Sequence, residues 1–405
     1  MKKLILFCLT LLSVMVQAQT TEIETFKIDS KILNEERMIK VDLPKLYSQS
    51  TKSYPLIVVL DDELIFPTIQ AIENQLSATS RMPESIVVSI AKGAKHRSYY
   101  APNLYDNVRK RRYRYGDHQE ELLGFFEKEL LPLLDKKYRT VKFRTLIGFS
   151  PAAIFTLHVL CKKRELFQAY VALAAGNIIG DGYKEGENFT DVISKVFDKG
   201  TGKHYLYVVS GSRDLKSQPH IKANVDYFNG KLVKPVLKNL RAKAEIIAGE
   251  GHTDVLLPGI ISAMDFIFPK EEWIVDYRDF LNQKGNVLSN IQQFYGNLSK
   301  KYGFTIYPKM DRLYSMSCFK NIGRALLRQK RNDEAIELFK YWKVLYPNLA
   351  TPYVYLGHAF KATKMSSEAL QAYEKAVEIA KQQANPELNK YENYLTELKK
   401  SLEKK

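Results

Sequence analysis

The chain has 405 residues, of which 45% are hydrophobic and 12% aromatic, a composition that excludes an intrinsically disordered chain. Its length leaves room for one large domain and a smaller one. The formal net charge is +16. Three cysteines and seven histidines show no metal-ligand spacing, so we expect neither a disulfide framework nor a metal centre, and no cofactor.

The first predicted element is a secretory signal peptide over residues 1–18. The segment MKKLILFCLTLLSVMVQAQ places two lysines before an apolar run and ends on small residues, which predicts cleavage after Ala18. We therefore expect an exported protein, periplasmic or secreted. No later stretch is long and apolar enough to predict a membrane span. Export leaves Cys161 and Cys318, which we expect to be buried apolar side chains, with their pairing left open.

Residues 19–270 alternate strands and helices. An alternating pattern over residues 25–44 predicts a β-hairpin, and β-branched runs at 54–63 and 84–91 predict strands buried on both faces of a parallel sheet. Helices are predicted at 67–76, at 118–138 and directly after Ser150. Further strands are predicted at 144–149, 169–175, 204–212 and 243–249. This alternation predicts a doubly wound α/β sheet that ends near residues 263–271.

A run of basic residues, VRKRRYRY at 108–115, interrupts this pattern. Arg109, Arg111 and Arg112 concentrate positive charge in one loop. Either the loop is simply solvated, or it attracts an anionic substrate. Nucleic acid is a poor candidate because no nucleic-acid-binding motif accompanies the run and the protein is predicted to be exported.

Residues 271–405 are predicted to form an all-α domain with an internal repeat. The segment at 321–348 aligns with 355–382 at an offset of 34 residues, and the alignment matches Gly323 with Gly357 and Phe339 with Tyr373. This period is similar to that of the tetratricopeptide repeat. Residues 276–319 are expected to add one degenerate helical pair. The domain is either a structural buttress or a groove for a protein partner.

Three residues follow predicted strands in the order used by α/β-hydrolases. Ser150 is the candidate nucleophile, Asp214 the candidate acid and His252 the candidate base. Glu250 is an alternative acid, since it also lies between a strand and the histidine. Each residue also has a plain structural interpretation: Ser150 as a helix cap, Asp214 as a turn residue and His252 as a loop residue.

The blocks YPLIVVLDDELIF, MPESIVVSIAKGAKHRSYYAP, FFEKELLPLLDKKYRTVKFRTLIGFS and GEGHTDVLLPGIISAMDFIF resemble the putative esterase family over residues 25–268. That family contains esterase D-like and siderophore-esterase-like α/β-hydrolases. The resemblance implies a small-molecule ester substrate, a serine nucleophile and a histidine at the position of His252. It also implies that the loop with Asp62 and Glu63 gives one oxyanion donor, and that a tetratricopeptide-like tail follows the hydrolase domain.

The sequence departs from the family pattern at the nucleophile itself. The family reads Gly-His-Ser-x-Gly-Gly, and this chain has GFSPAA at 148–153. Pro151 has no N–H to give to an oxyanion, and loss of one such donor costs about 10²–10³ in rate. A residue before proline also favours extended geometry, which predicts that Ser150 cannot form the sharp turn of a nucleophile. Two functions therefore stay open: an exported Ser-His-Asp esterase, or a weak or inactive relative that binds a ligand or protein through the cleft or the tail.

Overall fold

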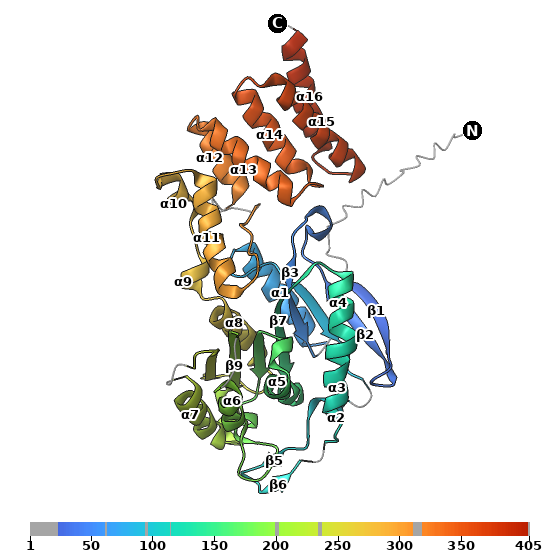
Figure 1. The fold of residues 1–405 in the computed structure, drawn as a ribbon, viewed down its shortest axis with the longest axis vertical. Coiled ribbons are helices and arrows are strands. Elements are labelled where there is room, and N and C mark those ends of the chain that lie inside the picture. Colours follow the sequence, from blue (N-terminus) through green and yellow to red (C-terminus); the bar gives the residue numbers. More distant parts are fainter. Residues whose placement is uncertain are drawn as a thin grey trace, which may run out of the picture.

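The computed structural model describes residues 23–60, 63–93, 96–113, 115–198, 202–233, 237–310 and 318–403. The predicted signal peptide, its cleavage site after Ala18 and Asp62 lie outside these residues. The molecule is elongated: an α/β part forms one end and a stack of helices forms the other (Figure 1). Within the described residues, we find no helix with the length and apolar character needed to cross a bilayer.

The α/β part is built on an eight-stranded sheet in the order β1-β2-β4-β3-β7-β8-β9-β10. The predicted hairpin is β1 (Glu24–Ser30) and β2 (Glu35–Asp42), an antiparallel pair at one edge. From β4 onward all neighbouring strands are parallel. Their bounds are β4 (Ile86–Ile90), β3 (Tyr54–Val59), β7 (Thr140–Phe149), β8 (Ala169–Leu173), β9 (His204–Gly211) and β10 (Leu240–Ile247).

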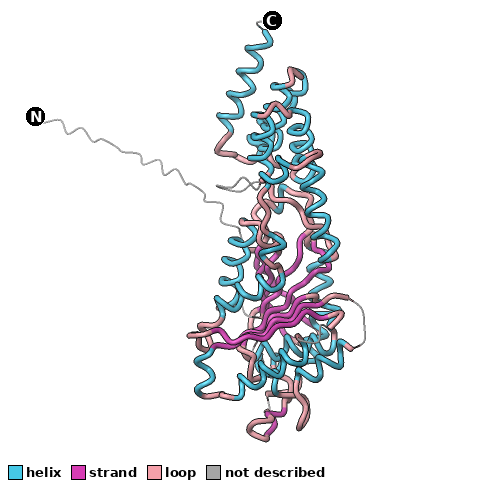
Figure 2. Tube along the Cα trace, turned by 90° about the vertical axis from the view of Figure 1, so that its left-hand side faces the viewer, coloured by secondary structure: helices cyan, strands magenta, loops and turns pink. Residues whose placement is uncertain are grey.

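Helices cover both faces of the sheet (Figures 1 and 2), as the alternation of elements predicts. Every residue of β3 is buried, with Ile57 and Val59 facing one core and Leu56 and Val58 the other. The first core is closed by α1 (Ile65–Ala78) and α8 (Leu256–Ile267). The second is closed by α2 (His96–Tyr100), α3 (Gln119–Phe125), α4 (Leu131–Lys137), α5 (Pro151–Lys162), α6 (Phe189–Phe197) and α7 (His220–Leu232). The fold is the doubly wound α/β sheet that we predicted.

In its described residues, the second part of the chain forms helices and no strands, also as predicted. Its helices are α9 (Lys270–Trp273), α10 (Tyr277–Asn282), α11 (Val287–Tyr302), α12 (Phe319–Arg328), α13 (Asn332–Leu345), α14 (Ala350–Ala362), α15 (Ser366–Gln382) and α16 (Leu388–Glu403). The two 34-residue repeats form the pairs α12–α13 and α14–α15. A Cβ on Gly323 would meet the Phe339 ring at 2.1 Å, and one on Gly357 would meet the Tyr373 ring at 2.4 Å. The matched residues of the repeat therefore lie where paired helices approach closely.

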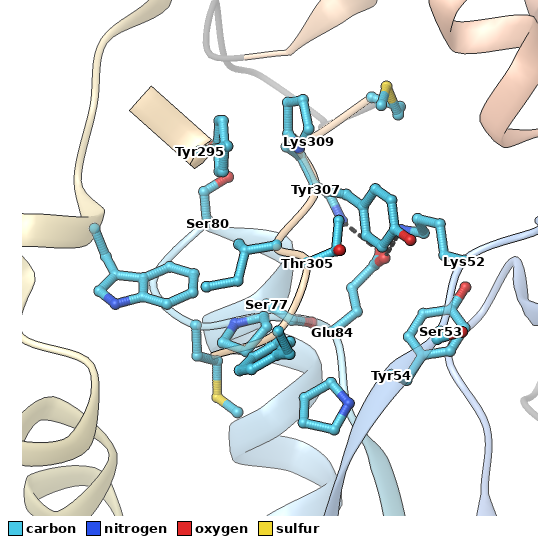
Figure 3. Close-up of a pocket in the computed structure, with 18 of the residues that line it drawn as sticks. Lys52, Ser53, Tyr54, Ser77, Ser80, Glu84, Tyr295, Thr305, Tyr307 and Lys309 are labelled. Carbon is cyan, nitrogen blue, oxygen red and sulfur yellow. Dashed lines mark hydrogen bonds and ion pairs between the residues drawn. The ribbon is translucent and has the colours of Figure 1, made fainter. Parts of the chain in front are cut away.

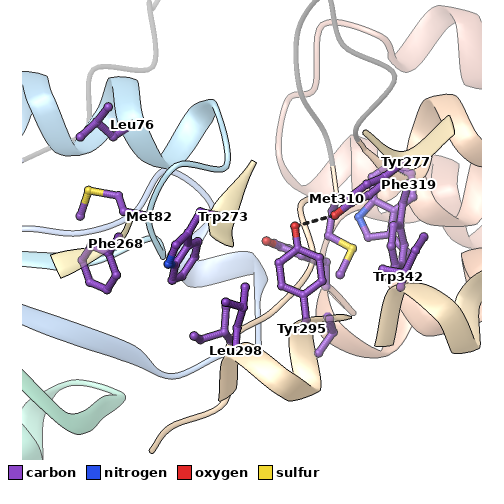
Figure 4. Packing of buried hydrophobic residues seen from close by; sticks show 14 of the residues in the cluster. Leu76, Met82, Phe268, Trp273, Tyr277, Tyr295, Leu298, Met310, Phe319 and Trp342 are labelled. Atoms are coloured by element: carbon purple, nitrogen blue, oxygen red, sulfur yellow. Dashed lines mark hydrogen bonds between the residues drawn. The ribbon is translucent and has the colours of Figure 1, made fainter. Parts of the chain in front are cut away.

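The helical part is packed firmly against the α/β part. One continuous hydrophobic cluster runs through both, and Figure 4 shows Phe268 and Trp273 at the junction, with ring centroids 5.2 Å apart. Glu84 also forms ion pairs with Lys52 and Lys309, from the two parts of the chain (Figure 3). The loop before β3 adds a hydrogen bond, from Thr51 N–H to the Leu345 carbonyl at 3.0 Å.

The two cysteines among the described residues, Cys161 and Cys318, are free thiols on different parts of the molecule. Cys318 is buried at the start of α12, as expected, and Cys161 is only half-buried near the end of α5. No group of three or more histidine, cysteine, aspartate or glutamate side chains in the described residues is arranged to hold a metal ion.

Candidate active site

Ser150 forms a strained turn between β7 and α5. Its backbone has φ 53° and ψ −116°, and its side chain makes no capping hydrogen bond to α5. The helix-cap interpretation is therefore wrong for this residue, and so is the prediction that Pro151 prevents the sharp turn. The clash with a following proline excludes helical ψ values, and −116° lies outside them. A positive φ in a non-glycine residue costs free energy and often marks a functional site.

The residues around Ser150 explain how the chain holds this turn. The Ser150 N–H donates to the Leu173 carbonyl at 2.9 Å, and its own carbonyl accepts from the Ala153 N–H at 3.0 Å. Gly148 allows α5 to approach β7 closely, because a Cβ there would lie 2.3 Å from the Ala152 carbonyl oxygen. Ala152 and Ala153 are buried in this contact. Alanine at these two positions is therefore compatible with the turn.

His252 and Asp214 lie beside Ser150, as their order in the chain predicted. Nε2 of His252 is 3.0 Å from Oγ of Ser150, and Nδ1 is 3.5 Å from Oδ2 of Asp214. Asp214 is largely buried, with 13% of its side chain exposed, whereas His252 is 46% exposed. The His252 ring also packs against Phe149, with centroids 5.2 Å apart.

Two loops at the carboxyl edge of the sheet bring this histidine and acid together. Asp214 lies in a short helix that directly follows β9, Ser212–Lys216, and His252 lies between β10 and α8. Gly211 lets the loops touch, since a Cβ there would be 2.3 Å from the Glu250 carbonyl oxygen. That carbonyl accepts the Arg213 N–H at 2.9 Å. Of the two candidate acids, the structure places the carboxylate of Asp214 against the imidazole.

The proposed oxyanion residues are only partly described. Glu63 is exposed in the segment that links β3 to α1, and Asp62 lies outside the described residues. Pro151 occupies the first position of α5 and offers no N–H there. The chain therefore lacks the usual donor from the residue that follows the nucleophile.

A pocket of about 90 Å³ opens beside Ser150. Its walls are mostly apolar and aromatic, with one carboxyl group among them. The lining residues are Leu104, Tyr113, Tyr115, Ser150, Pro151, Ile154, Ala174, Asn177, Ile178 and Asp181. The rings of Tyr113 and Tyr115 stack with centroids 5.3 Å apart. The sequence pattern gave no sign of this pocket, because its residues come from three separate loops and the start of α5.

The basic run contributes to this pocket through its tyrosines. It forms the small hairpin of β5 (Tyr105–Asp106) and β6 (Arg111–Arg112). Arg109, Arg111 and Arg112, all of them described, lie outside the pocket lining. The Arg109 guanidinium donates to the Tyr113 hydroxyl at 3.1 Å, and Arg112 donates to the Tyr183 carbonyl at 3.3 Å. In this structure the arginines support the hairpin and face solvent.

The chain is similar to several known proteins. The family model described as putative esterase matches residues 30–224. The chain is 24% identical over 230 residues to the ferri-bacillibactin esterase BesA of Bacillus subtilis (strain 168), a match that covers 52% of this chain and 76% of that protein.

Two solved structures share the fold. An IroE-like serine hydrolase from Shewanella oneidensis matches with a TM-score of 0.63 and 22% identity, covering 78% of this chain and 98% of that one. A protein from Capnocytophaga ochracea DSM 7271 matches with a TM-score of 0.55 and 17% identity, covering 93% of this chain and 99% of that one. The second match therefore extends over both the α/β part and most of the helical part.

Proposed function

Because the α/β domain is a member of the putative esterase family, we propose that this protein hydrolyses carboxylic esters of small molecules, with Ser150 as the nucleophile. The observation that carries the proposal is the 3.0 Å separation between Oγ of Ser150 and Nε2 of His252 on a strained turn. A serine that merely ended a strand would have no reason to maintain that strain.

The proposed reaction follows the acyl-transfer scheme of serine hydrolases. His252 takes the hydroxyl proton through Nε2 while Oγ of Ser150 attacks the ester carbonyl, and the tetrahedral intermediate then expels the alcohol, which His252 protonates. In the second half of the reaction, His252 takes a proton from water, which attacks the acyl carbonyl. The tetrahedral intermediate then releases the acid, and His252 returns the proton to Oγ of Ser150. Asp214 orients the imidazole through Nδ1 and stabilises its positive charge. The reaction needs no cofactor.

In this scheme the oxyanion has one backbone donor fewer than is usual for a serine hydrolase. With no N–H at Pro151, stabilisation has to come from the loop that links β3 to α1, where Glu63 lies, and we propose a slow enzyme as a result. The same observation favours a second candidate function, a ligand-binding protein built on a hydrolase fold. The two candidates differ in whether Ser150 reacts covalently.

A fluorophosphonate probe tests the choice. The purified protein should be labelled at one serine, labelling should vanish in Ser150→Ala, and it should fall strongly in His252→Ala. Ser217→Ala, which changes a serine of the neighbouring loop, is the matched control and should label as the wild type does. Folded wild-type protein that resists labelling would favour the binding function.

We further propose that the protein acts outside the cytoplasm after removal of residues 1–18. The support is the pattern of lysines, apolar residues and small residues at the N-terminus. Edman sequencing of protein recovered from the periplasmic or secreted fraction should begin at Gln19. Recovery of full-length protein from the cytoplasm would refute export.

A further inference from the structure

The pocket beside Ser150 has a firmly built outer wall. Tyr105 of the β5–β6 hairpin pairs with Gly182, its N–H donating to the Gly182 carbonyl at 2.8 Å. Asn107 reinforces this link, since its side-chain amide donates to the carbonyls of Gly180 at 2.9 Å and Glu187 at 2.7 Å. These bonds bring two carboxyl groups together: Asp181, which lines the pocket, and Asp106, which lies outside its lining.

The two carboxyl groups have very different surroundings. The Asp106 carboxylate accepts three hydrogen bonds from the hairpin. They come from the N–H groups of Val108 at 3.0 Å and Arg109 at 2.8 Å and from the hydroxyl of Tyr113 at 2.7 Å. Asp181 is 7% exposed and lines the pocket. Among the described residues, its side chain accepts one long hydrogen bond, at 3.4 Å from the Asn107 N–H to Oδ1.

A buried carboxyl group with so few partners is costly unless something else hydrogen-bonds to it. Leu104, Ile154 and Ile178 of the lining are apolar. Within the described residues, the polar side chains of the lining make no hydrogen bond to Asp181. Burial and the neighbouring Asp106 carboxylate raise the pKa of Asp181 to about 7. The carboxyl can therefore accept a hydrogen bond when ionised and donate one when protonated. A hydroxyl group is the ligand group that complements both forms, since it can donate or accept.

We propose that Asp181 is the specificity-determining residue of this pocket and that it binds a hydroxyl group on the acyl part of the ester. The inference rests on the proposed function, because it takes the acyl part of the ester that Ser150 attacks to occupy the pocket that Ser150 lines. The stacked rings of Tyr113 and Tyr115 offer a flat face to a planar acyl group, and Asp181 lies in the same lining.

The test uses three 4-nitrophenyl esters that share one leaving group: 3-(4-hydroxyphenyl)propanoate, 3-phenylpropanoate and 3-(4-methoxyphenyl)propanoate. Wild-type kcat/KM should be at least about tenfold higher for the hydroxylated ester, because a site built for a hydroxyl discriminates against analogues that lack it. The methoxy ester should be the poorest, because it has no hydrogen to donate and its methyl group has to fit where the hydroxyl hydrogen would lie. In Asp181→Leu the three values should agree within about threefold, and Asp181→Asn should retain part of the preference.

Controls separate this inference from the proposed function. Asp117→Leu removes an exposed acid from the loop that follows the hairpin and should leave the preference unchanged. If the wild type hydrolyses all three esters equally, or if Asp181→Leu keeps the preference, the role of Asp181 is refuted while esterase activity stands.

A binding measurement tests the role of Asp181 even if the wild-type protein neither hydrolyses the esters nor reacts with the fluorophosphonate probe. Calorimetric titration of Ser150→Ala with 3-(4-hydroxyphenyl)propanamide and 3-phenylpropanamide needs no catalysis. Tighter binding of the hydroxylated amide by about tenfold, lost in Ser150→Ala/Asp181→Leu, would support the role of Asp181. Equal binding of the two amides would overturn it.

Discussion

Nε2 of His252 lies 3.0 Å from Oγ of Ser150, although Ser150 is followed by a proline. The proline therefore leaves these two side chains in contact, and what it removes is a backbone N–H that an oxyanion could use. These two parts of the site can therefore be separated by mutation.

Restoring the missing N–H should raise activity. Pro151→Ala adds a backbone donor at the first position of α5 and should increase kcat for a simple 4-nitrophenyl ester, by up to about 10² if the new N–H reaches the oxyanion. Pro132→Ala is the control, since it removes a proline from the second position of α4, a helix that carries none of the three site residues. Unchanged or lower kcat in Pro151→Ala would show that the oxyanion is stabilised elsewhere.

Relieving the strain at Ser150 should stabilise the fold. At φ 53° and ψ −116° the backbone lies near the mirror image of the extended region, which glycine adopts readily. Ser150→Gly should therefore raise the free energy of unfolding by about 1 kcal/mol, measured by urea denaturation, while probe labelling is lost. Ser150→Ala keeps the strain and is the comparison variant. A Ser150→Gly protein that is less stable than Ser150→Ala would contradict the strain argument.

Asp214 should matter more than Glu250. In Asp214→Asn the amide can hold the imidazole in the wrong tautomer, and loss of the carboxylate removes charge stabilisation, so kcat should fall by about 10³–10⁴. Glu250→Gln should change kcat by less than about threefold, since the Glu250 backbone carbonyl, which that change leaves intact, makes the loop contact. Equal losses in the two variants would mean that the acids share the role.

Local patterns in the sequence predicted the strands, the helices and the order of the three site residues. Buried strands such as β3 are continuous apolar runs, and Ser150, Asp214 and His252 each follow such a run. The repeat was predictable for a similar reason, because Gly323 and Gly357 must be small to admit the rings of Phe339 and Tyr373.

What the sequence pattern could not supply was information about long-range contacts. The ψ angle of Ser150 follows from bonds to Leu173 and Ala153 rather than from the residue pair Ser-Pro alone. The Asp181 pocket depends on the pairing of Tyr105 with Gly182, which no periodicity records. The arginines were conspicuous in the sequence, but the tyrosines between them line the pocket.

The close helix contact in the repeat gives a prediction about stability. Gly357→Ala places a Cβ 2.4 Å from the nearest carbon of the Tyr373 ring, so the ring or the helix has to move. The free energy of unfolding should therefore fall by about 1–3 kcal/mol. Gly296→Ala, in an exposed part of α11 with open space around it, is the matched control and should stabilise by up to about 1 kcal/mol. Thermal denaturation of both variants measures the difference. Similar shifts in both would mean that α14 and α15 are loosely packed.

Glu73 should make the protein less stable as the pH rises. It is 5% exposed on α1, and its carboxylate accepts the Ser85 N–H at 2.8 Å. Burial is the main cause that raises its pKa to about 8 from 4.5, and the nearby Glu84 and Asp42 carboxylates add to the shift. Between these two values the folded protein holds a proton that the unfolded chain releases. Stability therefore falls as the pH rises through this window.

Glu73→Gln tests this directly, because an amide keeps the acceptor for Ser85 and cannot ionise. The difference in unfolding free energy between Glu73→Gln and wild type should grow in favour of the variant by about 1 kcal/mol per pH unit between pH ~5 and pH ~8. Urea denaturation at three pH values across this range measures it, and Glu271→Gln, at an exposed carboxyl on α9, should show no such trend. A constant difference across the range would mean that Glu73 is ionised in the folded protein and is stabilised by its neighbour Lys309.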